Sequence, residues 1–368
     1  MRVLWLVRPN LTSRPGGDTT QILRTQEALH QLGAEVVLCS DSEPDFRGYD
    51  LVHLFHLDRV WENLHWVKQI RTRGLPSVLS PIYWPTHEYD QLGRRGLQGV
   101  LSRNLGSMPY AGIRSFQHAL LSTWAAKRPS VLHPRVLFFK ACVKNTLQSV
   151  QRILPNSLSE QQQIEQYYGE TTACTVVPNA ADLATFRPHN EQCARNANKV
   201  ISVGRIEPRK NQLALIRALS GTPIQLSIVG QPSRFGHRYA RECYRAAGPN
   251  VTFHDWQSPR SLARHYREAR VHACTSWYET PGLASLEAAS SGCQVVATDR
   301  GATREYFGEH VEYCNPADPQ SIRSAVEKAL VRESGVELRD TISQFLTWAR
   351  AGEKTLEAYQ AVMGQTPS

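Results

Sequence analysis

Short apolar runs alternate with helical stretches along the first half of the chain. Residues 3–7, 35–39 and 51–55 are runs of strand length, rich in β-branched and apolar side chains. Residues 20–32 carry apolar positions at helical spacing, and residues 76–83 supply one more strand. Strands separated by helices and by Gly- or Pro-rich turns predict a parallel sheet with helices on both faces. We therefore expect a doubly wound α/β domain here.

The same alternation resumes in the second half, after a polar stretch rich in turn residues. We expect residues 1–180 to form a first domain, residues 181–198 a linker, and residues 199–368 a second domain with an amphipathic terminal helix. The expected strands of the second domain are 199–203, 224–229, 251–253, 270–274 and 293–298, and its expected helices are 210–219, 238–247, 259–268, 281–291 and 339–362. Parallel sheets bind ligands beyond the carboxyl ends of their strands, so two domains facing each other across a cleft are the expected architecture.

Length and composition agree with this architecture. A chain of 368 residues has room for two domains, and 41% hydrophobic residues are enough for two buried cores. The eight cysteines are scattered, with no C-x-x-C pair and no Cys/His cluster at metal-ligand spacing, as is typical of a reducing compartment. The first apolar run is too short for a secretory signal, and no stretch approaches about 18 uncharged apolar residues. A cytoplasmic location is expected.

The net charge of +9 is concentrated in one window of the chain. Residues 91–159 hold ten Lys and Arg and no Asp or Glu, whereas the segments before and after are close to neutral. Arg94, Arg95, Lys140 and Lys144, interleaved with apolar residues, are the expected face toward an anionic membrane surface or the acceptor. The alternative is that the apolar residues are core and the charges simply solvated. A nucleic acid partner is disfavoured, because no nucleic-acid-binding motif accompanies the charge.

The strongest candidate site is the stretch SWYETPGLASLEAASSG at residues 276–292. Thr280 as N-cap, Pro281 at the first helical position and a glycine at the end predict a helix that follows an expected strand. The free N–H groups of Gly282 and Leu283, together with the positive end of the helix dipole, would then form an anion site.

Two carboxylates flank this expected anion site. Glu279 precedes the helix and Glu287 lies within it. With a phosphate bound between them, the two acceptors would suit hydroxyl groups of two sugars joined by a diphosphate. The competing interpretation is that Glu279 only complements the helix dipole and that Glu287 is a solvated surface residue.

A second candidate is the stretch VGRIEPRKNQ at residues 203–212, which leaves an expected strand and turns at a proline. Arg205 and Lys210 would project at the carboxyl end of that strand. The Arg fork and the compact Lys charge suit the neutralisation of a leaving diphosphate. The competing interpretation is a basic turn in water, which the expected position near Glu279 weakens.

These motifs together resemble the family 4 retaining glycosyltransferases, which have the GT-B fold. The residues that carry the resemblance are GRIEPRKNQ at 204–212, the E-x7-E stretch ETPGLASLE at 279–287, VVPNAADLATF at 176–186 and the Gly16–Gly17 loop. Their order and spacing match over nearly the whole chain. The resemblance implies two Rossmann-like domains facing across a cleft and a nucleotide-diphosphate sugar as substrate.

The resemblance also implies which residues hold the donor diphosphate. Arg205 and Lys210 would bind it and stabilise the departing nucleoside diphosphate, and Gly16 and Gly17 would close over it from the first domain. No metal or other cofactor is expected, because the sequence has no D-x-D motif and positive side chains take over the work of a divalent cation.

On the same resemblance, Glu279 would contact the transferred sugar and Glu287 the ribose diol. The backbone N–H groups of Gly282 and Leu283 would donate to a phosphate.

The family commonly has a histidine after a first-domain strand that touches the transferred sugar. His87 is the favoured candidate, and Tyr83 is an alternative in the same stretch. His53 is a further candidate, although a lone histidine in an apolar strand is more often a core residue.

We therefore expect a metal-independent, retaining hexosyltransferase that moves a sugar from a nucleotide-diphosphate donor to a glycan or lipid-linked acceptor in bacterial surface polysaccharide biosynthesis. The alternatives are a sugar-nucleotide isomerase of the same fold, for which no acid/base pair is identified, and a non-catalytic nucleotide-sugar-binding module. An NAD enzyme is disfavoured because Gly16–Gly17 is not part of a G-x-G-x-x-G motif.

Overall fold

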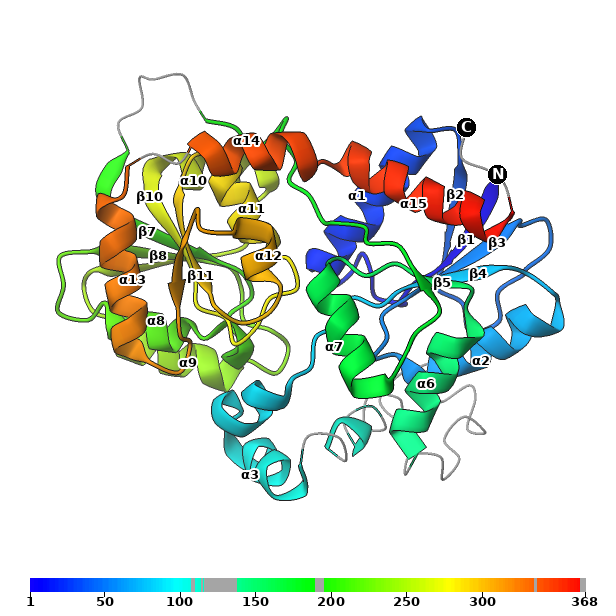
Figure 1. The fold of residues 1–368 in the computed structure, drawn as a ribbon. Helices are drawn as coiled ribbons and strands as arrows, with labels where there is room; N and C mark the ends of the chain where they lie inside the picture. Colours follow the sequence, from blue (N-terminus) through cyan, green and yellow to red (C-terminus); the bar gives the residue numbers. More distant parts are fainter. Residues whose placement is uncertain (107–109, 114, 116–137, 189–194, 334–335, 365–368) are drawn as a thin grey trace. The chain divides into compact units, whose positions relative to one another are not determined.

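The computed structural model describes residues 1–106, 110–113, 115, 138–188, 195–333 and 336–364. The chain forms two compact units. The first contains Met1–Pro85, Leu101–Asn179 and Trp348–Ser368, and the second contains Thr86–Val100 and Ala180–Thr347. Each unit has a parallel sheet with helices packed on both sides (Figure 1), which confirms the expected α/β fold.

The sheet of the first unit has, within the described residues, the strand order β2-β1-β3-β4-β5-β6, and every neighbouring pair is parallel. Its strands are β1 (Arg2–Leu6), β2 (Glu35–Cys39), β3 (Leu51–Phe55), β4 (Ser77–Ser80), β5 (Arg152–Ile153) and β6 (Ala173–Cys174). Its helices are α1 (Gly17–Gln31), α2 (Val60–Thr72), α6 (Phe139–Ser149), α7 (Leu158–Tyr168) and α15 (Trp348–Val362), and α3 (Gly96–Leu105) crosses the unit boundary.

Both faces of this sheet are buried, as a parallel sheet requires. Alternate residues of β1 point to opposite sides. Val3 and Trp5 pack in the core that α1 and α15 cover, whereas Leu4 and Leu6 pack in the core under α2 and α6. The strand order reverses between β1 and β3, so the loops that follow these two strands lie at the topological switch point, where open α/β sheets bind ligands.

The sheet of the second unit has, in the part of the chain described, the order β12-β11-β10-β7-β8-β9 and is also parallel. Its strands are β7 (Asn196–Val203), β8 (Gln225–Val229), β9 (Val251–His254), β10 (Ala269–Cys274), β11 (Gln294–Thr298) and β12 (Glu312–Cys314). Its helices are η1 (Tyr89–Gly93), η4 (Pro208–Lys210), α8 (Gln212–Ala218), α9 (His237–Ala246), α10 (Pro259–Glu268), α11 (Leu283–Ser290), α12 (Thr303–Phe307), α13 (Pro319–Val331) and α14 (Val336–Phe345). The switch point lies between β7 and β10.

The terminal helix differs from the expectation. We predicted one helix over about 339–362 within the second domain, but the chain breaks it into α14 and α15, and α15 belongs to the first unit. Burial explains the difference. Tyr359 is fully buried against the first sheet, where its hydroxyl accepts a hydrogen bond from Trp5 Nε1 at 2.9 Å. Gly352 lets α15 approach α1 closely, since a Cβ there would lie 2.7 Å from the Cβ of Ala28.

A second difference concerns the chain between the two units. We placed all of residues 1–180 in the first domain and a linker at 181–198, but residues 86–100 fold with the second unit, as do the residues from Ala180 onward. Ala181 already bonds within that unit, donating its N–H to the carbonyl of Leu346 at 3.2 Å. Residues 189–194 of the expected linker lie outside the described residues.

Candidate functional site

Lys210 and Glu279 meet at the switch point of the second sheet. Lys210 ends η4, in the loop that follows β7, and Glu279 lies in the loop that follows β10. These strands are parallel neighbours, so their carboxyl ends bring the two loops together. Lys210 Nζ donates to Glu279 Oε1 at 2.5 Å. The two motifs that the sequence singled out therefore form one site.

Glu279 is a buried carboxylate held by two cations. Glu279 is only 7% exposed. Besides Lys210, the guanidinium of Arg209 lies near its carboxylate, 3.9 Å from Oε1. Burial alone would raise the pKa of this carboxyl, but the charges of Lys210 and Arg209 outweigh it and lower the pKa to about 2. Glu279 is thus ionised across the physiological pH range.

Arg209 is a site residue that we did not single out from the sequence. In the sequence, Arg209 lies between Arg205 and Lys210, the two residues of this motif that we did select. Its guanidinium lies 3.4 Å from the Glu207 carboxylate and donates to the carbonyl of Tyr278 at 3.2 Å. The guanidinium also lies over the Tyr278 ring, 5.2 Å from its centre. Arg205, by contrast, is 55% exposed and reaches only Glu207 in the described structure, at 3.8 Å.

Two glycines allow the loops of the site to approach each other. Gly230, at φ +145°, has no room for a side chain, since a Cβ would lie 2.1 Å from the carbonyl oxygen of Gly204. Gly301, at φ +93°, is equally tight, because a Cβ would lie 1.9 Å from the carbonyl oxygen of Glu279. Ala302 N–H then donates to that same oxygen at 2.9 Å. The backbone of Glu279 is therefore fixed by the loop after β11.

The helix after Glu279 begins later than expected. We predicted Thr280 as its N-cap, but α11 begins at Leu283 with Gly282 as the N-cap residue, in the left-handed conformation (φ +76°). A glycine such as Gly282 adopts a positive φ at little cost. A proline such as Pro281 cannot, because its ring holds φ negative. The N–H groups of Gly282 and Leu283 make no hydrogen bond to the described residues. They lie beside Glu279 in sequence, as the motif implied.

Glu287 is mostly buried rather than a solvated surface residue. It lies on α11, and the hydroxyl of Tyr266 donates to its Oε2 at 3.4 Å. Burial raises the pKa of Glu287 to about 8, in spite of the Tyr266 hydrogen bond, and the charge of Asp182 adds to the increase. The competing interpretation of a solvated surface residue is wrong for this position.

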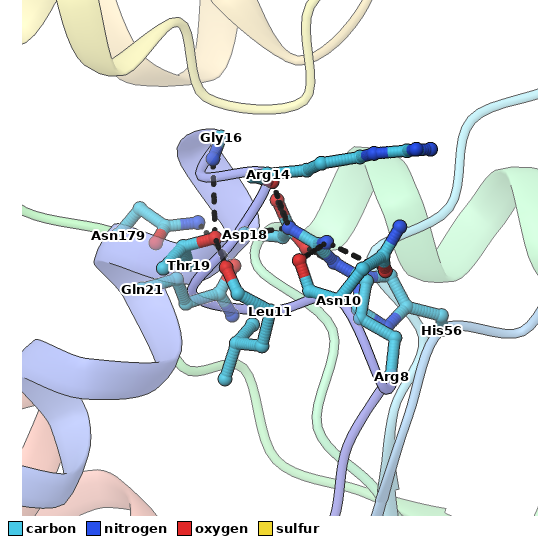
Figure 2. Close-up of polar contacts among 10 residues, drawn as sticks. All are labelled: Arg8, Asn10, Leu11, Arg14, Gly16, Asp18, Thr19, Gln21, His56 and Asn179. Carbon is cyan, nitrogen blue, oxygen red and sulfur yellow. Dashed lines mark hydrogen bonds and ion pairs between the residues drawn. The ribbon is translucent and has the colours of Figure 1, made fainter. Parts of the chain in front are cut away.

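The Gly16–Gly17 loop lies at the switch point of the first sheet and is organised by Arg8 (Figure 2). Arg8 lies two residues after the end of β1 and donates to both carboxylate oxygens of Asp18, at 2.6 and 3.3 Å. It also donates to the carbonyls of Asn10 (2.6 Å) and Arg14 (2.8 Å). One guanidinium therefore binds both ends of the loop.

Gly16 caps α1 through its backbone. Its N–H donates to Thr19 Oγ1 at 3.1 Å, and Gly17 is the first residue of the helix. Asp18 in the first turn also pairs with His56, whose Nε2 lies 3.2 Å from Oδ2. His56 directly follows β3 and has a φ of +67°. The sequence offered a signal for this cluster that we did not use: Arg8 and His56 lie within two residues of the ends of the two strands that flank the switch point.

The three candidates for a sugar-contacting residue have different surroundings. His53 is buried in the core, bonded to the Tyr359 hydroxyl at 2.6 Å and to Ser80 Oγ at 2.9 Å, and burial lowers its pKa to about 3. The interpretation of His53 as a core residue is therefore confirmed. Tyr83 bonds through its hydroxyl to Tyr168 at 3.2 Å. His87 is exposed and belongs to the second unit, not to the first.

The four basic residues expected on a membrane face divide into two groups. Lys140 and Lys144 are exposed on α6. Arg94, by contrast, is only 11% exposed and pairs with the buried Asp90 at 2.7 Å, and Arg95 pairs with Glu242 of α9 at 2.9 Å. Arg94 is therefore covered rather than open, whereas Arg95 stays 49% exposed. Both are paired with acids outside the basic window, Asp90 just before it and Glu242 far along the chain.

Much of the basic window, residues 107–109, 114 and 116–137, lies outside the described residues. Among the helices that are described, none combines the length and apolar character needed to cross a membrane.

Comparison with known proteins agrees with the geometry of the second unit. Residues 187–345 match the family described as glycosyl transferases group 1. A D-inositol 3-phosphate glycosyltransferase of Nocardia farcinica is 30% identical over 247 residues, which cover 60% of this chain and 54% of that protein. A protein of the same name from Rhodococcus erythropolis is 34% identical over 172 residues, covering 41% and 38%. The chain thus spans about half the length, or less, of these curated relatives.

Solved structures resemble the whole fold. A sucrose-phosphate synthase from Thermosynechococcus elongatus superimposes with a TM-score of 0.75 at 17% identity, over 99% of both chains. The Anabaena protein HepE, in complex with UDP and glucose, superimposes with a TM-score of 0.71 at 15% identity, over 98% of this chain and all of the other. At these identities the likeness concerns the fold alone. The chain therefore has the GT-B fold, and its residues 187–345 are similar to glycosyl transferases group 1.

Proposed function

We propose that the chain transfers a hexosyl group from a nucleotide-diphosphate sugar to a glycan or lipid-linked acceptor, with retention and without a metal ion. The observation that carries the proposal is the cluster of Lys210, Arg209 and Glu279 at the switch point of the second sheet. It combines fixed positive charge with one buried carboxylate, directly before the unpaired N–H groups of α11.

The charges of the cluster fit a leaving diphosphate. Lys210 and Arg209 face Glu279, and Arg209 also lies 3.4 Å from Glu207, so these four charges cancel before a ligand binds. Arg205, whose side chain is 55% exposed, adds the net positive charge beside them. Preorganised charge of this kind stabilises a developing anion because it does not have to reorient during the reaction. Metal-free transfer stays a prediction.

The proposal also gives a role to each of the other residues expected to bind the nucleotide-sugar donor. The N–H groups of Gly282 and Leu283 would donate to a phosphate, and Glu287 would accept from the ribose diol once it has lost its proton. Glu279, ionised and held by two cations, would accept from a hydroxyl of the transferred sugar. Gly16 and Gly17, fixed by Arg8, would cover the diphosphate.

The acceptor is the least constrained part of the proposal. The relatives named above are named for an inositol phosphate, a phosphorylated polyol, which makes a phosphorylated polyol one acceptor to test beside glycans and lipid-linked glycans. Cytoplasmic transfer during surface polysaccharide assembly remains our preferred context.

We also retain an anionic membrane surface as a proposed partner, on a revised set of residues. The revised set consists of Lys140 and Lys144 on α6 and the exposed Leu101 and Leu105 of α3, all of which belong to the first unit. Basic and apolar side chains in this combination favour the surface of an anionic bilayer. Flotation with anionic vesicles should fall for Lys140→Glu/Lys144→Glu, and unchanged binding would contradict this part.

A panel of nucleotide sugars tests the proposed function. The purified protein is incubated with each donor, alone and with a glycan, an inositol phosphate or a polyprenyl-linked glycan, and nucleoside diphosphate and product masses are measured. Acceptor-dependent release of nucleoside diphosphate, with a product heavier by one hexosyl unit, is the expected result. An isomerised donor without release would favour the isomerase, and binding without any conversion would favour a non-catalytic module.

A further inference from the structure

Residues 86–95 follow a segment of the first unit in the sequence, but they pack against the second unit. This anchor segment follows β4, contains η1, and is drawn in cyan in Figure 1. Two ion pairs fix it at either end. Glu88 Oε2 accepts from Arg300 Nε at 2.6 Å, in the loop after β11, and Arg95 pairs with Glu242 of α9.

The segment has a rigid interior. Asp90, 1% exposed, accepts from Arg94 Nε and from Thr86 Oγ1, both at 2.7 Å. The guanidinium of Arg94 then lies over the Tyr89 ring, 4.7 Å from its centre. Because these contacts join residues on both sides of η1, which begins at Tyr89, the orientation of Tyr89 is fixed.

Tyr89 and Gly93 pack on the loop that carries Glu279. The ring of Tyr89 lies 6.3 Å from that of Trp277 and 6.5 Å from that of Tyr278. The backbone of Gly93 packs directly against the Trp277 ring, since a Cβ at position 93 would lie 2.4 Å from Trp277 Cε2. This packing has no tolerance for a shift of the segment or for an added methyl group.

The packed loop in turn holds Arg209. Trp277 N–H donates to the carbonyl of Arg209 at 2.8 Å, and the Arg209 guanidinium donates to the carbonyl of Tyr278 at 3.2 Å while lying over its ring. Arg209 and Lys210 are the two cations that face Glu279. A continuous chain of contacts therefore runs from Tyr89 through Trp277 and Tyr278 to the ionised cluster.

We propose that the anchor segment is a positioning element for the transfer step, with Tyr89 as the positioning residue that fixes the Trp277–Tyr278 loop and through it Arg209 and Glu279. The inference rests on the proposed function, since it concerns the cluster that would act on the donor. The charges of Arg209 and Glu207 also act on the Tyr89 hydroxyl, but the ring packs on Trp277 and Tyr278, and we assign the positioning effect to this packing.

The test compares four variants by kcat and KM for the donor that the panel identifies, normalised to folded protein by the thermal transition. Tyr89→Ala removes the ring, Tyr89→Phe keeps it, Gly93→Ala forces Trp277 to move, and Gln91→Ala is the matched control, because Gln91 is exposed on the same helical turn. A displacement of about 1 Å at a reacting group costs up to about a hundredfold in rate.

We expect kcat to fall at least about tenfold in Tyr89→Ala and Gly93→Ala, with a smaller change in KM, and to stay within about twofold in Tyr89→Phe and Gln91→Ala. A purely structural role would lower the melting temperature and leave kcat per folded molecule unchanged, and that result would overturn the inference. Equal loss in Tyr89→Phe and Tyr89→Ala would also overturn it, since the hydroxyl rather than the packing would then matter. An inactive wild-type protein would instead contradict the proposed function itself.

Discussion

Lys210 Nζ and Glu279 Oε1 lie 2.5 Å apart, although 69 residues separate them in the chain. The pair is mostly buried, with 18% and 8% of the two side chains exposed. A buried pair is costly to break, because removal of one partner leaves the other charge without compensation.

The stability of the second unit should depend on this pair. Lys210→Met or Glu279→Gln should lower the free energy of unfolding by up to about 3 kcal/mol, toward the lower end of the range for buried pairs. Lys199→Met is the matched control, because Lys199 pairs with Glu268 at 2.7 Å at the surface and should cost less than about 1 kcal/mol. Urea unfolding measures both, and equal losses in the two pairs would contradict the special role of Lys210.

Glu287 should make folding stability fall between about pH 4.5 and pH 8. Its pKa is raised from 4.5 to about 8 in the folded protein, so over this range the unfolded chain has lost a proton that the folded protein still holds. The contribution that favours folding is therefore complete below pH 4.5 and is lost as the pH rises.

Glu287→Gln should remove that pH dependence. The variant should gain stability relative to wild type at pH 8 compared with pH 5, in urea unfolding at the two pH values. Glu309→Gln, at an exposed position of the same unit, should leave the difference unchanged. A stability difference between Glu287→Gln and wild type that is the same at pH 5 and pH 8 would show that Glu287 is not protonated in the folded protein.

Arg8 should control the order of the Gly16–Gly17 loop. Arg8→Ala removes the side-chain hydrogen bonds that tie Asn10, Arg14 and Asp18 to one guanidinium and leaves only the backbone bond from the Arg14 N–H to the Asn10 carbonyl between two of them. Amide hydrogen exchange over residues 9–18 should therefore rise at least about tenfold. Arg8→Lys should rescue little, because an ammonium group cannot reproduce the planar fork. Arg14→Ala is the control, since only the main-chain oxygen of Arg14 receives a hydrogen bond from Arg8. Unchanged exchange in Arg8→Ala would refute the clamp.

The same clamp predicts an acid-dependent contribution from Asp18. Its interactions with His56 and Arg8 outweigh burial and hold its pKa well below the usual value. The stabilisation is therefore complete above about pH 4 and is lost as the pH falls below that value. Asp18→Asn should be destabilised at pH 7, and its difference from wild type should become smaller as the pH falls from 4 to 3 in thermal melts. A difference that is independent of pH would contradict the ion pairs.

His53 should make the first unit sensitive to mild acid. Because burial lowers its pKa from 6.5 to about 3, the unfolded chain takes up a proton below about pH 6.5 that the folded protein does not, and stability falls. His53→Gln should lose this component between pH 7 and pH 5, whereas His87→Gln, at an exposed position, should retain it. Thermal melts at the two pH values distinguish them.

The fold was largely predictable, because parallel strands buried on both faces leave a strong apolar signal. The strands near 199–203 and 224–229 were expected within a few residues of β7 and β8. The unit to which the terminal helix belongs could not be predicted. Periodicity indicates which face of α15 is buried, but not which of the two sheets that face packs against. The packing of Tyr359 on Trp5 decides that, across most of the chain.

The site was predictable where its residues share a motif and hidden where they do not. Lys210 and Glu279 each lie in a recognisable stretch, and the neighbouring strands β7 and β10 bring them together. The start of α11 was misplaced by two residues, since Gly282 in a left-handed conformation competes with the Thr-Pro signal. The anchor segment could not be expected, because its contacts with Trp277 join residues about half the chain apart.

The most direct test of the central claim measures acceptor-dependent release of nucleoside diphosphate by wild type, Glu279→Gln, Lys210→Met and the surface control Lys199→Met, at one pH and with saturating donor. The account predicts that the first two variants fall at least about a hundredfold, the scale of losing a preorganised electrostatic contact, while the control stays within about twofold. Turnover near the wild-type rate in both Glu279→Gln and Lys210→Met would contradict it.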